Sequence, residues 1–232
     1  NKKFYIFLFI LIFFLCMLIT GERSNTIKFI LGLVVFMSLN PFIKFKFKLI
    51  SLIVVILVCI SAYLSSDKIK LRYGGQLINL IDSKEKRDLY LKENTYLNLY
   101  RSGIEVFKKY PIKGVGNKNY RIETCGYGSN PKYFCNTHPH QIYIEFLSEH
   151  GLAGSLLFLS VIFFLIFKNF RVMIVSKNSI QLGSFCFLLI NFIPILPSGS
   201  FFTDFNATFF WLNFSIFYAS NSKTNIFSKQ GD

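Results

Sequence analysis

Residues 4–19 read FYIFLFILIFFLCMLI, an unbroken apolar run that decides the class of protein. Over the whole chain 52% of the residues are hydrophobic and only 16% are charged, whereas soluble domains are about 25% charged. Since a helix needs about 20 residues to cross the hydrocarbon core, the sequence predicts an all-α protein, a bundle of about six transmembrane helices. The five further apolar runs lie at residues 27–43, 49–64, 152–167, 180–196 and 201–219.

The first run also resembles a signal peptide in length. It is followed by Gly21, Glu22 and Arg23 instead of a small-residue cleavage site, so we interpret it as a span. The chain begins with Asn1 rather than Met. We therefore expect it to be a piece of a longer protein.

The distribution of charge orients the predicted helices. The chain has 26 Lys and Arg against 12 Asp and Glu, a net charge of +14. In a soluble protein this excess would suggest nucleic acid, but many of these cations flank apolar runs, where they bind anionic membrane lipids. With the first residue cytoplasmic, short connections on that side are cationic and the opposite ones nearly uncharged. The cytoplasmic cations are Lys44, Lys46, Lys48, Lys168, Arg171, Lys177, Lys223 and Lys229.

This orientation divides the chain into spans at residues 1–64, an outer segment at 65–150, spans at 151–219 and a cytoplasmic tail at 220–232. The long outer segment alone has room for a site like that of a soluble enzyme, and we expect it to be partly helical. Asp82 and Glu85 predict the start of one helix, and a second helix is predicted to end before Pro111. Residues 123–139 have the composition of an irregular loop. The predicted apolar face of the second helix consists of Tyr96, Tyr100, Ile104 and Phe107.

Four features of the outer half can carry chemistry: Arg23 after the first run, Arg101 on the predicted helix, the turn at residues 111–116, and His140 with Gln141 before the fourth run. Each has a plainer explanation when taken singly. An arginine at a membrane surface often reaches headgroup phosphates, a glycine turn reverses the chain, and a histidine beside a helix start often caps it or lies on the surface.

Two carboxylates follow the histidine. Glu145 and Glu149 lie four residues apart on one helix face, where like charges repel slightly. We expect one of them to pair with a Lys or Arg, or to be exposed to water.

Together these features resemble the family of O-antigen ligases, O-antigen polymerases and bacterial protein O-oligosaccharyltransferases. Its signature is His, then Asn, Ser or Gln, then nine residues and Gly-x-x-Gly. Here His140 and Gln141 are followed, after that gap, by Gly151 and Gly154. The Thr-Gly-Glu-Arg sequence ending at Arg23 resembles the family's Ser/Thr-Gly-x-Arg loop. The resemblance covers most of residues 15–170, and because members have more spans, the chain resembles their C-terminal half.

A further segment, an arginine followed by a helix and Pro-x-x-Gly-x-Gly, matches Arg101 through Gly116. The resemblance implies a multi-pass glycosyltransferase of the bacterial inner membrane with a periplasmic active site, using neither cofactor nor metal. The donor would be a glycan on undecaprenyl diphosphate. The acceptor would be the lipid A core in a ligase, another lipid-linked glycan in a polymerase, or a protein serine, and the His-Gln spacing leans toward the ligase.

The resemblance also implies roles for individual residues. Arg23 and Arg101 would hold the diphosphate and stabilise its developing charge. His140, as a neutral imidazole, would accept the proton of the acceptor hydroxyl. The remaining substrate-binding residues would be Gly114, Gly116 and Gln141.

Three alternatives stay open. His138 is a second candidate base, although only His140 has the nine-residue spacing. Cys125 and Cys135 have three possible states: a disulfide, which an oxidising compartment favours, two free thiols, or a metal site shared with the histidines.

The whole protein has two alternative functions besides glycan transfer, as a transporter or as an assembly subunit. Because transporters place ionisable residues in mid-membrane and the first five runs have almost no charge at their centres, we favour an interfacial enzyme.

Overall fold

The computed structural model describes residues 2–75, 78, 81, 83–126, 130–176, 178–225 and 227–228. These residues form helices and connecting loops without a β-strand, so the predicted all-α class is confirmed. The chain divides into two compact units, Asn1–Tyr90 and Leu91–Asp232, which we describe one at a time.

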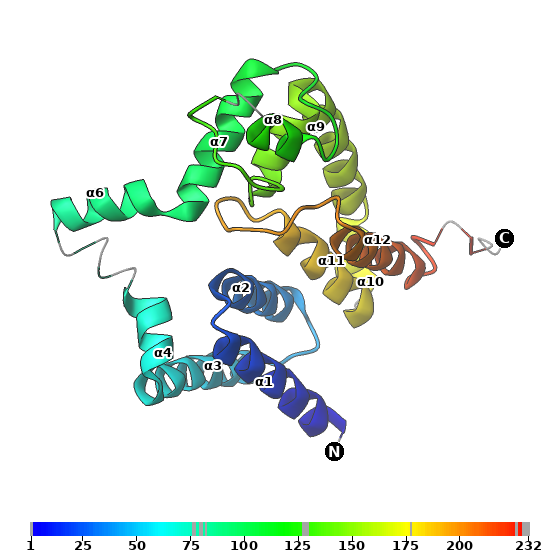
Figure 1. The fold of residues 1–232 in the computed structure, drawn as a ribbon. Coiled ribbons are helices and arrows are strands. Elements are labelled where there is room, and N and C mark those ends of the chain that lie inside the picture. The colour runs from blue at the N-terminus through cyan, green and yellow to red at the C-terminus, as the bar shows by residue number, and fades with distance from the viewer. Residues whose placement is uncertain are drawn as a thin grey trace. The chain divides into compact units, whose positions relative to one another are not determined.

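The first unit is built on three helices that pack against one another, α1 (Lys2–Thr20), α2 (Arg23–Leu39) and α3 (Phe45–Ser65) (Figure 1). Gly21, in the left-handed region with φ 72°, turns the chain from α1 to α2. The α2 helix ends sooner than its apolar run because Asn40 precedes Pro41 and takes extended backbone. The short α4 (Asp67–Ile69) and a π-helical turn, η1 (Lys70–Gly75), follow α3.

The α6 helix (Lys84–Glu93) begins close to the predicted position and crosses from the first unit to the second. Its N-cap is Ser83, whose Oγ accepts a hydrogen bond from the Lys86 N–H at 3.2 Å. Asp82, the predicted cap, lies outside the described residues.

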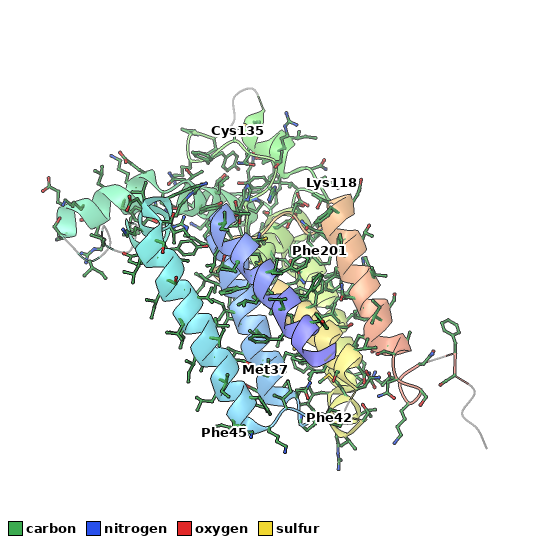
Figure 2. All side chains as sticks on the ribbon, turned by 90° about the horizontal axis from the view of Figure 1, so that it is seen from below. Met37, Phe42, Phe45, Lys118, Cys135 and Phe201 are labelled. Carbon is green, nitrogen blue, oxygen red and sulfur yellow. A yellow bond between two sulfur atoms is a disulfide. The ribbon has the colours of Figure 1, made fainter. Side chains whose placement is uncertain are left out.

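The second unit contains two pairs of packed helices, α7 with α9 and α11 with α12 (Figure 1). Its core is aromatic. The ring centroid of Phe201 lies 5.4 Å from that of Phe146 and 5.0 Å from that of Phe210, and Figure 2 shows Phe201 among these helices. The helices are α7 (Thr95–Lys109), α8 (Tyr120–Cys125), α9 (Ile142–Lys168), α10 (Phe170–Ser176), α11 (Ser179–Asn191) and α12 (Asp204–Ala219).

Each of the six apolar runs falls largely on a helix, but their lengths differ from the prediction. Among the described residues, two helical stretches are long and apolar enough to cross a membrane, Phe45–Ser65 and Ile142–Ser176. The count of six spans is therefore not confirmed. The fifth run is helical only as far as Asn191, because Pro194 follows within the run.

The buried face of α7 differs from the predicted one. Tyr96 and Ile104 are exposed, although the apolar pattern placed them on the inner face. Small side chains explain the difference, since Gly103 lets Ile144 of α9 approach closely and Ser102 accepts hydrogen bonds from Tyr120 and Phe134, and apolar periodicity does not count such residues. The α8 helix likewise extends into the segment at 123–139 that was expected to be irregular. The buried residues of α7 are Leu99, Ser102, Gly103 and Val106.

Candidate active site

The site is built around the start of α9. Gln141 is the N-cap of this helix, and its side-chain Oε1 accepts a hydrogen bond from the Ile144 N–H at 2.7 Å. The α9 helix therefore begins directly after Gln141. Gln141 is only 5% exposed, so the structure gives it a capping role, and its contact with a substrate stays a prediction.

His140 has an unusual backbone conformation, with φ 56°. A left-handed conformation costs a non-glycine residue about 1–2 kcal/mol, so neighbouring groups must hold it. The His140 carbonyl accepts a hydrogen bond from the Ser198 N–H at 2.8 Å. The preceding Pro139 is buried against α7, where a Cβ on Gly103 would lie 2.9 Å from the Pro139 Cβ. Strain held in this way is common at functional sites.

The two candidate imidazoles lie face to face. The ring centroids of His138 and His140 are 3.9 Å apart, with 37° between their planes. The ring of Tyr96 on α7 meets His140 edge-on, with centroids 5.8 Å apart. His138 Nδ1 is hydrogen-bonded to the Thr137 hydroxyl at 2.9 Å, whereas its buried Nε2 has no partner among the described residues.

Burial keeps both imidazoles neutral at physiological pH. Burial, and to a smaller extent the neighbouring His140, lower the pKa of His138 to about 4. Burial also lowers the pKa of His140, while the backbone of Ser198 opposes the shift. A neutral imidazole can accept a proton, so both rings are chemically competent as bases.

The two glycine motifs interlock through their backbones. In the turn at residues 111–116, the Gly116 N–H donates a hydrogen bond to the Glu149 carbonyl at 2.8 Å. In α9, the Leu152 N–H donates to the Pro111 carbonyl, also at 2.8 Å. Gly114 and Gly151 both have positive φ, and a Cβ on either would overlap the opposite backbone. The glycines therefore allow a close crossing at the kink in α9, where Gly151 has non-helical backbone angles. A substrate contact at Gly114 or Gly116 stays a prediction.

The two glutamates of α9 fasten loops to this helix. Glu149 is 2% exposed and accepts a hydrogen bond from the Lys118 N–H at 2.9 Å. Glu145 is 1% exposed and accepts from the Ser200 hydroxyl and from the Phe201 N–H, the latter at 2.9 Å. The expectation that one of them pairs with a Lys or Arg, or is exposed to water, was wrong. Within the described chain no Lys or Arg side chain forms an ion pair with either one, and backbone and hydroxyl donors satisfy them instead.

The loop between α11 and α12 forms a third part of the site, which the sequence analysis missed. Besides the Ser198 bond to His140, its Ile195 carbonyl accepts from the Tyr100 hydroxyl at 3.1 Å. The carbonyl of Phe192, the first residue of the loop, accepts a hydrogen bond from the Tyr143 hydroxyl at 2.6 Å. The loop has no cation and was interpreted only as a short connection. Its Pro-Ile-Leu-Pro-Ser-Gly sequence at 194–199 was the available signal, since such segments form structured turns.

Of the two candidate arginines, only Arg101 belongs to the same unit as His138 and His140. Arg101 is exposed, and its Nη1 lies 3.4 Å from Asn98 Oδ1. At about 100° per residue, Arg101 lies on nearly the opposite side of α7 from the buried Leu99 and Val106. Arg23 is the half-buried first residue of α2 and belongs to the first unit.

Of the three cysteine alternatives, the structure contains the disulfide between Cys125 and Cys135. Two hydrogen bonds from this region reach α7, since the Tyr120 hydroxyl and the Phe134 N–H both donate to Ser102 Oγ at 2.9 Å. The described residues contain no cluster of three or more His, Cys, Asp or Glu suited to a metal ion. The loop that carries the histidines is thus anchored from its N-terminal side.

A family model described as O-antigen ligase matches residues 7–159, from α1 into the second half of α9. The chain belongs to the O-antigen ligase family. The matched stretch contains both arginines, both glycine motifs and His140, so the residues that suggested the resemblance lie inside it. Members of the O-antigen ligase family are glycosyltransferase-like enzymes of the bacterial inner membrane that use lipid-linked glycans and acceptors. No curated protein and no solved structure matches the chain.

Proposed function

We propose that the chain carries the active site of an O-antigen ligase, which transfers a glycan from undecaprenyl diphosphate to a hydroxyl of the lipid A core. The observation that carries the proposal is the anchoring of His140. Its carbonyl is held by Ser198 at 2.8 Å, the preceding proline is packed on α7, and the next residue caps α9. A base held on three sides is pre-organised for proton transfer.

The proposed reaction is a displacement at the anomeric carbon of the first sugar. The acceptor oxygen gives its proton to His140 and forms a bond to that carbon. The bond from the carbon to the phosphate oxygen breaks, and the leaving diphosphate takes the electron pair. Arg23 and Arg101 hold the diphosphate and stabilise its added charge, since a guanidinium can contact two phosphate oxygens at once.

The chemistry is proposed to occur on the periplasmic face of the inner membrane, with residues 65–150 outside and six helices spanning the bilayer. The alternation of cationic and nearly uncharged connections supports this orientation. The half-buried histidines support it too, because a site at the headgroup level admits a lipid-linked donor and a polar acceptor together. Lipid binding is expected from the flanking cations.

A polymerase of the same family is the second candidate, because it differs only in the acceptor. The spacing of nine residues between the His140-Gln141 pair and Gly151 favours the ligase. A transporter would need charged groups at mid-membrane depth, and residues 49–64 of α3 contain no Asp, Glu, Lys, Arg or His.

The test uses the purified full-length protein in proteoliposomes with one lipid-linked glycan donor. Lipid A core and a second lipid-linked glycan are offered as acceptors in separate reactions. A ligase gives glycosylated lipid A core and a polymerase gives only longer lipid-linked chains. Movement of the donor across the bilayer without any transfer would contradict both enzymes and support a transporter.

A further inference from the structure

An arginine that carries no role so far lies beside the turn that leads to Arg23. The Arg72 side chain, from η1, packs on Gly21, and a Cβ built on that glycine would lie 3.6 Å from both Cγ and Nε of Arg72. Gly21 is two residues before Arg23 in the turn from α1 to α2. Both arginines belong to the first unit. The fold therefore places a second guanidinium at the turn that carries the first.

Contacts on either side of Arg72 fix the position of η1. The Tyr73 hydroxyl lies 2.9 Å from Thr26 Oγ1, which links η1 to the first turn of α2. Gly74 packs against α3 so closely that a Cβ there would lie 2.7 Å from the Tyr63 hydroxyl. A π-helical turn is rare and often marks a functional position. Arg72 thus projects from a segment that is held in place without using its own charge.

The Arg72 guanidinium is accessible and uncommitted. Its residue is exposed, and within the described part of the first unit no carboxylate or carbonyl oxygen accepts a hydrogen bond from it. The nearby cation Lys70, by contrast, is paired with Asp67 at 2.9 Å. An exposed Glu22 in the same turn is the opposing charge, and it would limit affinity for anions.

We infer that Arg72 is a further diphosphate-binding residue, which grips the lipid-linked donor together with Arg23. The inference rests on the proposed function, because it takes the ligand to be undecaprenyl diphosphate. A diphosphate offers oxygens on two phosphorus atoms, so one guanidinium fork can be used on each phosphate. The first turn of α2 adds to the attraction, since Glu22 makes no side-chain cap there and helix N-termini favour anions.

The test measures retention of radiolabelled undecaprenyl diphosphate and of uncharged undecaprenol by the purified full-length protein in detergent. Arg72→Met keeps the stem that packs on Gly21 and removes the charge, and Arg72→Lys keeps stem and charge but removes the fork. Arg87→Met is the matched control, because Arg87 is an exposed arginine of the same unit, and its Nε lies 3.9 Å from the carboxylate of its neighbour Asp88.

We expect Arg72→Met to weaken diphosphate binding about tenfold and Arg72→Lys several-fold, with undecaprenol binding and thermal stability unchanged. Arg87→Met should bind as the wild type does. Equal diphosphate affinity in Arg72→Met and the wild type, or an equal loss for undecaprenol, would overturn the role of Arg72. If the wild-type protein itself did not prefer the diphosphate to undecaprenol, the proposed function would fail instead.

Discussion

Gly103→Ala tests whether α7 sets the position of His140. Gly103 faces Pro139 and Ile144, and an added Cβ would lie 2.9 Å from the Pro139 Cβ and closer still to the Ile144 methyl group. Ordinary van der Waals contacts begin at 3.4 Å, so Pro139 must move by about 0.5 Å, the difference 3.4 − 2.9 Å. Because His140 follows Pro139 directly, its ring should move with it.

The expected loss of activity exceeds the expected loss of stability. A misplacement of 1 Å costs on the order of 10² in rate, so a shift of half that size should lower glycan transfer about tenfold. Overpacking costs about 1–3 kcal/mol, but alanine is favoured over glycine in a helix by about 1 kcal/mol. The net change in the free energy of unfolding should therefore be a loss of about 0–2 kcal/mol.

The assay compares Gly103→Ala with Gly183→Ala at equal protein levels in proteoliposomes, together with thermal unfolding in detergent. Gly183 lies inside α11 of the same unit, and an added Cβ there meets nothing within 4 Å. Gly183→Ala should keep full transfer and gain about 0.5–1 kcal/mol of stability. Equal transfer by the two variants would refute the reasoning that α7 positions the base.

Three further predictions concern protonation, the donor and topology. Since burial lowers the pKa of His140 below the ordinary histidine value of 6.5, the midpoint of the acid-side fall in kcat/KM should lie below pH 6.5; a midpoint above that pH would contradict this. Arg23→Lys and Arg101→Lys should both impair transfer because lysine lacks the planar guanidinium fork, and full activity in both variants would contradict the role of the two arginines in holding the diphosphate. Ser83→Cys, in a chain whose three free cysteines are replaced by alanine, should react with a membrane-impermeant reagent in intact spheroplasts. Labelling only after lysis would reverse the orientation.

Apolar run length and proline position predicted most of the helices. The end of α7 before Pro111 is confirmed, because it depends on a local backbone preference. The end of the fifth run was wrong, since residues 193–196 are apolar but non-helical. Hydropathy alone does not distinguish an apolar loop that packs on a site from the end of a span.

The candidate residues could be named from the sequence, but the contacts that hold them could not. The motif around His140 was visible in the sequence, whereas its bond to Ser198 joins positions far apart in the chain and leaves no local pattern. Glu145 and Glu149 were expected to need cations or water, but loop N–H and hydroxyl donors satisfy them. The spacing of the glycines is explained by packing, because Gly114 and Gly151 both lie where the backbone of the turn at 111–116 crosses that of α9.

The most direct test of the account measures glycan transfer to lipid A core by His140→Ala and His138→Ala at matched membrane levels. General-base assistance is worth about 10²–10⁴ in rate, so His140→Ala should lose activity by that factor while still binding the donor. His138→Ala should lose much less, because that ring stacks on His140 at 3.9 Å but its backbone is not held by Ser198. An equal loss in both variants, or a larger loss in His138→Ala, would contradict the assignment of His140 as the base.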